Sequence, residues 1–360
     1  MYQFEKINSV HIEITSKCNA ACPMCLRNVK GGRVNPYLPI TSLTTQDIQY
    51  IFDADLIHQL KRIHFIGNYG DPILAPDLLE TIQYFRSINP YMRVHIHTNG
   101  GVRATEWWER LARIATRVVF GIDGLEDTNH IYRRGVNWKM LMRNVESFIQ
   151  AGGHAEWMFI VFKHNEHQIE EARDLASRMG FKKFSTKKTG RFFSNMLIKG
   201  KDVQEVWDAE GNLEYYLEKP THETNVNSAL KNEININREF GNLEEYLTQT
   251  EIDCKVLKET SFYLSAEGLV FPCCWTAGML YPWNFEENSS QIWDFLRKLP
   301  EGKNSINARK YPLRQILKGP FFEEHIPRAW ERGALDKERL FICSKTCGKK
   351  FNPYEDQFKG

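Results

Sequence analysis

Several features are missing from this 360-residue chain, and their absence narrows its class. It has no run of about 18 apolar residues, so we expect no membrane-spanning helix. Its first residues, MYQFEKINSV, lack the charged and apolar segments of a secretory signal, so a cytoplasmic protein is expected. Neither charge dominates, because 47 Lys and Arg face 45 Asp and Glu, which argues against nucleic-acid or membrane partners.

Cysteine is missing from the long central stretch between residues 26 and 253. The eight cysteines gather instead near the two ends of the chain, at Cys18, Cys22, Cys25, Cys254, Cys273, Cys274, Cys343 and Cys347. A chain of this length can bury a hydrophobic core without disulfides. Clustered cysteines in a cytoplasmic protein therefore indicate metal or redox chemistry.

The first half of the chain alternates strand and helix patterns. Six apolar or alternating runs lie at residues 10–15, 62–66, 94–98, 117–122, 156–162 and 182–186, and a helical pattern follows each of the first five. One of the helices is expected to be capped by Thr45 and to continue to Leu56. Repeated strand–helix units predict an α/β fold, a partial (β/α)6 TIM-like barrel of parallel strands.

After residue 190 this period breaks. A hairpin is expected over residues 203–220, followed by a polar stretch to residue 250 whose pattern assigns no element. A second hairpin is expected over residues 262–274, turning at Glu267 and Gly268. The predicted division is a core at 1–190, a polar insert at 191–250, and a small β-hairpin/α domain at 251–360.

The front cysteines follow the first predicted strand with the spacing C-x3-C-x2-C. Three thiolates in one loop suit an iron–sulfur cluster, and three ligands on a four-iron cluster leave one iron open. A zinc site is the alternative, with His11 as a possible fourth ligand. The place at the end of a strand in a strand–helix series is where α/β folds carry their chemistry.

This spacing after the first strand resembles the radical S-adenosylmethionine (SAM) superfamily over residues 8–190. The resemblance implies that Cys18, Cys22 and Cys25 hold a [4Fe-4S] cluster that binds SAM. It also implies that Met24 lies near the adenine of SAM. Members cleave SAM reductively to a 5′-deoxyadenosyl radical, which abstracts hydrogen from a substrate C–H bond.

Later motifs resemble those of the same family in order along the chain. Tyr69-Gly70-Asp71-Pro72 resembles Gly-Gly-Glu-Pro, which holds the SAM amino group, but it has Tyr for the first Gly and Asp for Glu. The resemblance further assigns SAM or substrate contacts to Thr98, Asn99, Asp123 and Asn165, and the SAM carboxylate to Arg134. Each of these short motifs is also compatible with an ordinary turn or a solvated side chain.

The rear cysteines resemble the auxiliary-cluster domains called SPASM and twitch. Thirteen residues separate Cys254 from Gly268, and four more separate Gly268 from Cys273. With Cys343 and Cys347 these cysteines make four thiolates, enough for one closed auxiliary [4Fe-4S] cluster and hence the shorter twitch form. Cys274 is then the spare cysteine, and a four-cysteine zinc site remains the alternative.

The resemblance leaves the substrate open between two classes. We expect modification of a ribosomally made peptide, with two-electron oxidation of a small metabolite as the alternative. The auxiliary cluster is expected to accept an electron from the substrate radical. Expected partners are a flavodoxin or ferredoxin as electron donor and, for a peptide substrate, a separate recognition protein. A zinc-stabilised binding module without enzymatic activity is the second alternative.

Overall fold

The computed structural model describes residues 3–192, 202–284, 286–331 and 338–351. Its main feature is an eight-stranded sheet with the order β10-β9-β1-β2-β3-β4-β5-β6. Neighbouring strands from β1 to β6 are parallel. These six strands are Ser9–Ile12, Arg62–Phe65, Arg93–Thr98, Arg117–Gly121, Ala155–Val161 and Lys183–Lys188. The predicted α/β fold with a partial parallel barrel is therefore confirmed.

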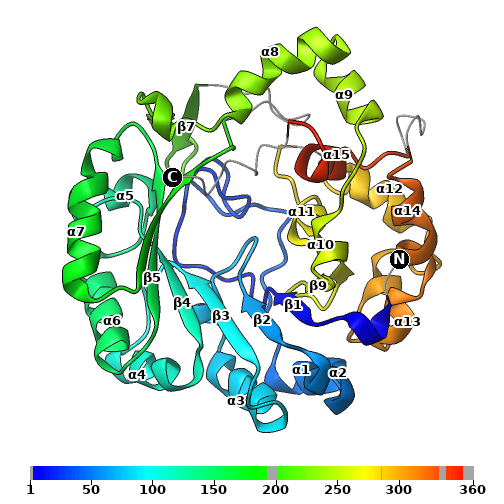
Figure 1. Ribbon diagram of the computed structural model, residues 1–360, viewed down its shortest axis with the longest axis horizontal. Coiled ribbons are helices and arrows are strands. Elements are labelled where there is room, and N and C mark those ends of the chain that lie inside the picture. Colours follow the sequence, from blue (N-terminus) through cyan, green and yellow to red (C-terminus); the bar gives the residue numbers. More distant parts are fainter. Residues whose placement is uncertain (1–2, 193–201, 285, 332–337, 352–360) are drawn as a thin grey trace.

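Helices connect the parallel strands and cover the outer face of the curved sheet (Figure 1). They are α1 (Thr45–Ile51), α2 (Ala54–Gln59), α3 (Leu78–Ile88), α4 (Thr105–Ile114), α5 (Asn129–Tyr132), α6 (Trp138–Gln150) and α7 (Ile169–Met179). Helix α7 ends at Gly180, whose φ of 90° is the left-handed conformation that glycine adopts readily. None of the described helices is long and apolar enough to cross a bilayer.

The two faces of the barrel sheet differ in chemistry. Side chains alternate between faces along a strand, and on β3 the apolar Val94 and Ile96 are fully buried in the core beside the helices. The alternate positions carry His95 and His97. On the neighbouring strands, His64 lies opposite His95, and Lys187 lies opposite Ile160. The concave face thus carries polar side chains next to apolar ones such as Val119 and Ile160, unlike the uniformly apolar interior of a closed barrel.

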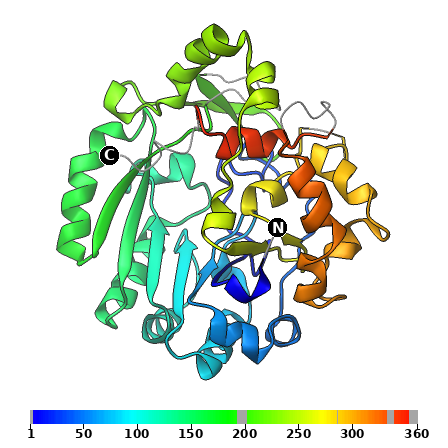
Figure 2. The ribbon, with the colours of Figure 1, turned by 45° about the vertical axis from the view of Figure 1, so that its right-hand side comes forward.

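The predicted second hairpin extends this sheet. Strand β9 (Ser261–Leu264) pairs in parallel with β1, and β10 (Val270–Phe271) pairs antiparallel with β9. Gly268 makes the turn with a φ of 87°. The C-terminal segment therefore shares the sheet of the first half, as Figure 2 shows beside β1. The predicted division at residue 251 stays a prediction.

The remaining elements lie after the barrel strands. The predicted first hairpin is present as β7 (Val203–Trp207) and β8 (Leu213–Glu218). The polar stretch without a sequence assignment forms helices α8 (Ala229–Phe240) and α9 (Leu243–Gln249), and residues 193–201 of the predicted insert lie outside the described residues. The later helices are α10 (Lys255–Lys258), α11 (Cys274–Ala277), α12 (Gln291–Arg297), α13 (Leu313–Leu317), α14 (Ile326–Arg328) and α15 (Phe341–Cys347).

The expected helix from Thr45 to Leu56 differs in the structure in two ways. Thr44 is the cap, because its hydroxyl accepts the Asp47 N–H at 3.0 Å while the Asp47 carboxylate accepts the Thr44 N–H at 2.8 Å. This is a capping box. The helix then ends at Ile51, because Asp53 caps a new helix by accepting the Leu56 N–H at 2.8 Å.

Candidate active site

The front cysteine loop leaves β1 at the carboxyl end of the parallel strands and lies inside the arc of the sheet (Figure 1). Two backbone contacts hold it. The Ala21 N–H donates to the Arg134 carbonyl at 2.9 Å, and the Cys25 N–H donates to the Cys22 carbonyl at 3.0 Å. Cys22 is buried, and Cys18 and Cys25 are half-buried. The loop is thus fixed at the edge where parallel sheets place ligand sites.

The three front thiols lie close enough to affect one another electrostatically. Burial and the neighbouring Cys25 raise the pKa of the Cys22 thiol to about 11, while the charge of Arg133 opposes the shift. Burial, Asp71 and both other cysteines also raise the pKa of Cys18. Three crowded, desolvated thiols are poor thiolates alone, whereas a bound cationic centre removes this penalty. This donor set therefore fits an iron–sulfur cluster.

A polar group from elsewhere in the fold approaches each of these sulfurs. The Asn99 Nδ2 donates to the Cys18 Sγ at 3.7 Å. The Arg133 Nη1 lies 3.8 Å from the Cys22 Sγ. The Cys25 Sγ lies 3.9 Å from the Asn68 carbonyl oxygen. Loops after β2, β3 and β4 therefore all meet at the cysteine loop.

Arg133 is held by a buried carboxylate. Its Nε donates to the Asp123 Oδ2 at 2.6 Å, and the Ile160 N–H donates to the other carboxylate oxygen at 2.6 Å. Asp123 is fully buried. Burial raises the pKa of Asp123, while the Arg133 charge opposes that change. The pair fixes a positive charge beside Cys22.

The neighbouring Arg134 has its partners on strand β8. Its guanidinium forms an ion pair with Glu214 of β8 at 2.7 Å and donates to the Tyr215 hydroxyl at 3.3 Å. The assignment of Arg134 to the SAM carboxylate stays a prediction. The structure instead brings Arg133 to the cysteines, and the consecutive arginines gave no signal of which would turn inward.

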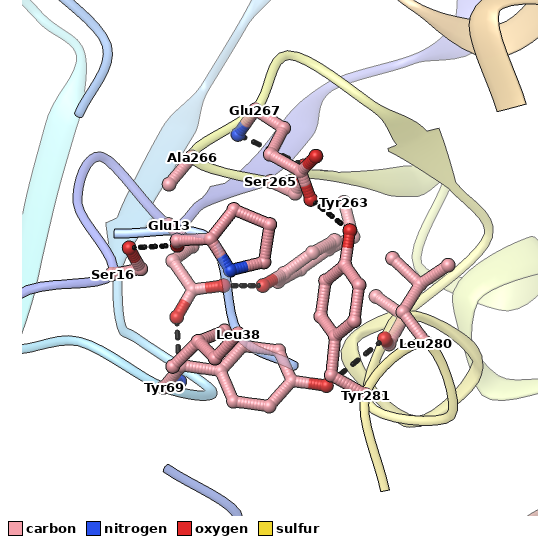
Figure 3. Close-up of a pocket in the computed structure, with 12 residues that line it drawn as sticks. Glu13, Ser16, Leu38, Tyr69, Tyr263, Ser265, Ala266, Glu267, Leu280 and Tyr281 are labelled. Carbon is pink, nitrogen blue, oxygen red and sulfur yellow. Dashed lines mark hydrogen bonds between the residues drawn. The ribbon is translucent and has the colours of Figure 1, made fainter. Parts of the chain in front are cut away.

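The Tyr69–Pro72 loop is tied to β1 and to the rear hairpin, as Figure 3 shows. The Glu13 carboxylate accepts the N–H groups of Tyr69 and Gly70, at 2.6 and 3.0 Å, and also the Tyr263 hydroxyl. Burial raises the pKa of Glu13, and these donors oppose the shift. Glu13 was not singled out in the sequence, and it joins the front loops to β9.

Asp71 of the same loop is occupied by donors from the chain itself. It accepts the Asn99 N–H at 2.7 Å and the Ile73 N–H at 3.2 Å, and it is buried. Burial raises its pKa despite these bonds. In this arrangement the Asp71 carboxylate holds the loop after β3 through the Asn99 N–H. A direct contact of Asp71 and Pro72 with SAM stays a prediction.

The other predicted SAM-site residues also shape loops at this edge. Thr98 accepts the Gly100 N–H at 3.0 Å, and Asn99 accepts the Gly101 N–H at 2.8 Å. Asn165 is fully buried and donates to the Asp123 carbonyl at 2.9 Å. The Met24 carbonyl accepts a hydrogen bond from Arg191. Their contacts with SAM stay predictions, and the structure brings their loops to the same strand ends.

The four rear cysteines come from three separate segments. Cys254 precedes α10, Cys273 precedes α11, and Cys343 and Cys347 both lie on α15. A hydrogen bond from Cys254 lowers the pKa of the Cys347 thiol to about 6. Burial and the charge of Cys273 raise the pKa of Cys343. The four sulfurs thus interact with one another.

Cys274 belongs to a different environment from Cys273. Burial raises the pKa of the Cys274 thiol most, and the charges of Cys273 and Glu13 raise it further. Cys274 also acts electrostatically on Lys187 of β6, whose pKa is lowered to about 8 mainly by burial. Cys274 is therefore close to Glu13 and Lys187, while Cys273 is close to Cys343 and Cys347. This supports Cys273 as the ligand of the adjacent pair.

Two further groups at the rear site fit a bound anionic cluster. The indole Nε1 of Trp330 is buried without a hydrogen-bond partner among the described residues. The fully buried Arg339 lies near Cys343 and lowers its pKa. The described residues contain no group of three or more His, Cys, Asp or Glu side chains placed to bind a single metal ion.

Asn68 connects the two cysteine groups. Its carbonyl lies beside the Cys25 sulfur, and its side-chain Nδ2 donates to the Cys274 carbonyl at 2.7 Å. Sequence patterns singled out neither Asn68 nor Arg339, because neither lies in a cysteine motif. Their hydrogen bonds to Cys274 and Leu247 span 206 and 92 residues of chain.

Comparisons with known proteins agree with this geometry. Residues 12–176 match the family model of the Radical SAM superfamily. A curated protein of Pyrococcus furiosus, the tungsten-containing aldehyde ferredoxin oxidoreductase cofactor-modifying protein, is 25% identical over 174 residues. That match covers 45% of this chain and 46% of the relative, so the chain spans less than half of the relative's length.

Solved structures share the fold. Native anSMEcpe with bound AdoMet matches 94% of this chain and 89% of its own, with a TM-score of 0.54 and 15% identity. Streptococcus suis SuiB bound to its precursor peptide SuiA matches 75% of this chain and 60% of its own, with a TM-score of 0.50 and 14% identity. Residues 12–176 therefore match the Radical SAM superfamily, and the solved structures show that the fold is shared over most of the chain.

Proposed function

We propose that this chain is a radical SAM enzyme whose front cysteines, Cys18, Cys22 and Cys25, hold a SAM-binding [4Fe-4S] cluster. The observation that carries this proposal is the convergence of three thiols at the strand ends of a radical SAM domain. A reduced cluster of this kind, with SAM on its open iron, supplies a 5′-deoxyadenosyl radical that abstracts hydrogen from a substrate C–H bond. The protein's task is then to position the substrate and exclude water.

Residues around the front loop suit that task. The buried Asp123–Arg133 pair holds a positive charge beside Cys22, where it stabilises thiolate charge. The concave face offers polar contacts from neutral histidines, since burial lowers the pKa of His97 to about 3 and that of His11 to about 4. Lys187 adds a cationic or neutral amine at this face, depending on pH.

We propose that the rear cysteines, Cys254, Cys273, Cys343 and Cys347, hold an auxiliary [4Fe-4S] cluster of the twitch type. Four thiols close the donor set, so substrate would have no free iron to bind there. This favours a role as electron acceptor for the substrate radical, which would make the net reaction a two-electron oxidation. The hydrogen bond from Asn68 to the carbonyl of Cys274, the neighbour of Cys273, supports a rear site close to the front loop.

For the substrate we propose a ribosomally made peptide. Two structures of this fold were solved with peptides, SuiB with SuiA and anSMEcpe with the Cp18Cys peptide, at TM-scores of 0.50 and 0.52. Dehydrogenation of a small metabolite is the alternative. A flavodoxin or ferredoxin would supply the electron, and a separate protein would help to recognise a peptide.

The test combines metal analysis with SAM cleavage on the anaerobically reconstituted chain. We expect about eight iron and eight sulfide per chain, as two four-iron clusters require, and 5′-deoxyadenosine after addition of dithionite. The control is the Cys18→Ala/Cys22→Ala/Cys25→Ala variant, which should keep about four iron and form no 5′-deoxyadenosine.

Other results discriminate between the alternatives. About four iron with bound zinc would retain the SAM chemistry and make the rear site structural. Zinc without iron and without SAM cleavage would overturn the proposal and support a zinc-stabilised binding module. Candidate peptides and metabolites would then be compared by the 5′-deoxyadenosine that each stimulates.

A further inference from the structure

Trp330 lies against the rear cysteine site just after α14. Its backbone carbonyl accepts a hydrogen bond from the Arg339 Nη1 at 3.2 Å, and the Arg339 Nε donates to the Ser344 hydroxyl at 3.1 Å. Ser344 is the residue after Cys343. The buried arginine therefore ties the backbone of Trp330 to the helix that carries two of the rear cysteines.

The indole N–H of Trp330 is unusual among the described tryptophans. Those of Trp108, Trp157 and Trp293 donate to backbone carbonyls at 3.0, 2.8 and 2.8 Å. The Trp330 Nε1 is buried and has no acceptor in the part of the chain that the structure describes. Because a buried donor without a partner is costly, such a group usually serves a ligand or an unfilled site.

The indole N–H of Trp330 lies within hydrogen-bonding reach of the Cys343 sulfur. The buried Arg339 is hydrogen-bonded to Ser344, the neighbour of Cys343, and so places a positive charge close to the same sulfur. A donor and a cation beside one sulfur both stabilise negative charge there, although the free thiol leaves the buried indole N–H unsatisfied among the described residues.

We propose that Trp330 donates an N–H···S hydrogen bond to Cys343 when the rear cluster is bound, and so raises the reduction potential of that cluster. The inference rests on the proposed auxiliary cluster. Reduction adds one electron and one negative charge to the cluster, and a donor at its sulfur stabilises the more negative state. In turnover the electron would come from the substrate radical, and no bond to Trp330 is made or broken. The hydrogen bond thus favours the rear site as an electron acceptor.

The test measures the potential of the rear cluster in the full chain. The Cys18→Ala/Cys22→Ala/Cys25→Ala background removes the front signal, and dithionite titration is followed by the EPR signal of the reduced rear site. Trp330→Phe should shift the potential to a more negative value. Trp330→His, which can supply an N–H, should recover part of that shift.

Trp293→Phe is the matched control, since its N–H already serves the Leu280 carbonyl, and it should leave the potential unchanged. Should Trp330→Phe fail to bind iron, β-(benzothienyl)alanine at this position replaces only the N–H by sulfur and keeps the ring shape. About eight iron in the wild-type chain with an unchanged potential in these variants would overturn this inference alone. About four iron in the wild-type chain would overturn the auxiliary cluster and the inference together.

Discussion

The front and rear cysteine groups each bring several thiols together, but they differ in how many segments of the chain supply them. The front group needs only eight consecutive residues, from Cys18 to Cys25, and one loop brings its thiols together. The rear group collects four thiols from three segments, the last of which lies on α15 far along the chain. A local loop can form its site before the whole fold is complete, whereas the rear site requires the fold.

An arginine accompanies each group, and the described partners of the two differ. Arg133 at the front pairs with the buried Asp123 carboxylate. Arg339 at the rear donates to the carbonyls of Leu247, Thr250 and Glu331. The front arginine is thus held by a carboxylate from one loop, whereas the rear arginine is held by backbone carbonyls from several segments.

The largest expected effect separates the adjacent cysteines at the rear. Cys273→Ala should lose about four of about eight iron atoms per chain and still form 5′-deoxyadenosine from SAM, because the front cluster remains. Cys274→Ala is the matched control and should keep the full iron content, since Cys274 faces Glu13 and Lys187.

Iron and sulfide analysis with SAM cleavage on both variants provides the measurement. The opposite pattern, with iron lost only from the Cys274 variant, would make Cys274 the ligand and contradict the assignment of Cys273. Cys343→Ala and Cys347→Ala should behave as Cys273→Ala does and should stall turnover after hydrogen abstraction. A wild-type yield of product from them would disprove the acceptor role of the rear site.

A smaller effect is expected from the arginines. Arg133→Met leaves the buried Asp123 without its counter-charge, which should cost about 3–5 kcal/mol of unfolding free energy. Adding Asp123→Asn should restore part of that loss. Arg339→Met should cost about 1–3 kcal/mol for each buried acceptor that stays unpaired.

Urea unfolding of wild type, Arg133→Met, Arg133→Met/Asp123→Asn and Arg339→Met under anaerobic conditions measures these differences in unfolding free energy. Arg134→Met is the control for the front pair, because its ion pair with Glu214 is partly exposed and should contribute at most about 1 kcal/mol. Equal losses for Arg133→Met with and without Asp123→Asn would show that the carboxylate does not determine the cost.

The smallest effect concerns Glu13, which links the two regions. Burial raises its pKa in the folded protein above the unfolded value, so the folded state holds the proton more tightly. The unfolded state therefore ionises first as pH rises, and stability is lost between the two pKa values. Wild type should lose stability relative to Glu13→Gln as pH rises above about 4.5, the ordinary glutamate range.

This difference is measured as the urea midpoint of each chain across that pH range. Tyr263→Phe removes one of the donors to Glu13 and should make the wild-type trend steeper, because the ionised carboxylate loses a partner. A constant difference between wild type and Glu13→Gln at all pH values would show that Glu13 keeps an ordinary pKa.

Much of the fold followed from periodicity. The six barrel strands lie within a few residues of their predicted ranges, because each has an apolar side chain at alternate positions or a continuous apolar run. The boundary near Thr44 was missed by one residue, since Thr44 and Thr45 are equally suited as caps until Asp47 selects one. Helices α8 and α9 were missed because their sequence is polar and only a small cluster with Tyr246 and Leu247 anchors them.

The candidate site divides in the same way. The front triad and its place after β1 were predicted, because spacing within one loop is a local property of the sequence. The pairing of Arg133 with Asp123 and of Arg134 with Glu214 was not predicted, since it depends on residues from other elements. Asn68 and Trp330 lie in no cysteine motif, and the hydrogen bond from Asn68 to Cys274 spans 206 residues of chain.

By itself, the sequence determined the parallel strand–helix series and the loop of three cysteines, because both depend on residues close together in the chain. Only the tertiary structure decided that β9 would join β1, that Cys273 rather than Cys274 would face α15, and that Arg133 would reach the front sulfurs. The physical reason is that strand order, burial and charge pairing arise from contacts between distant segments. Such contacts exist only once the hydrophobic core has brought those segments together.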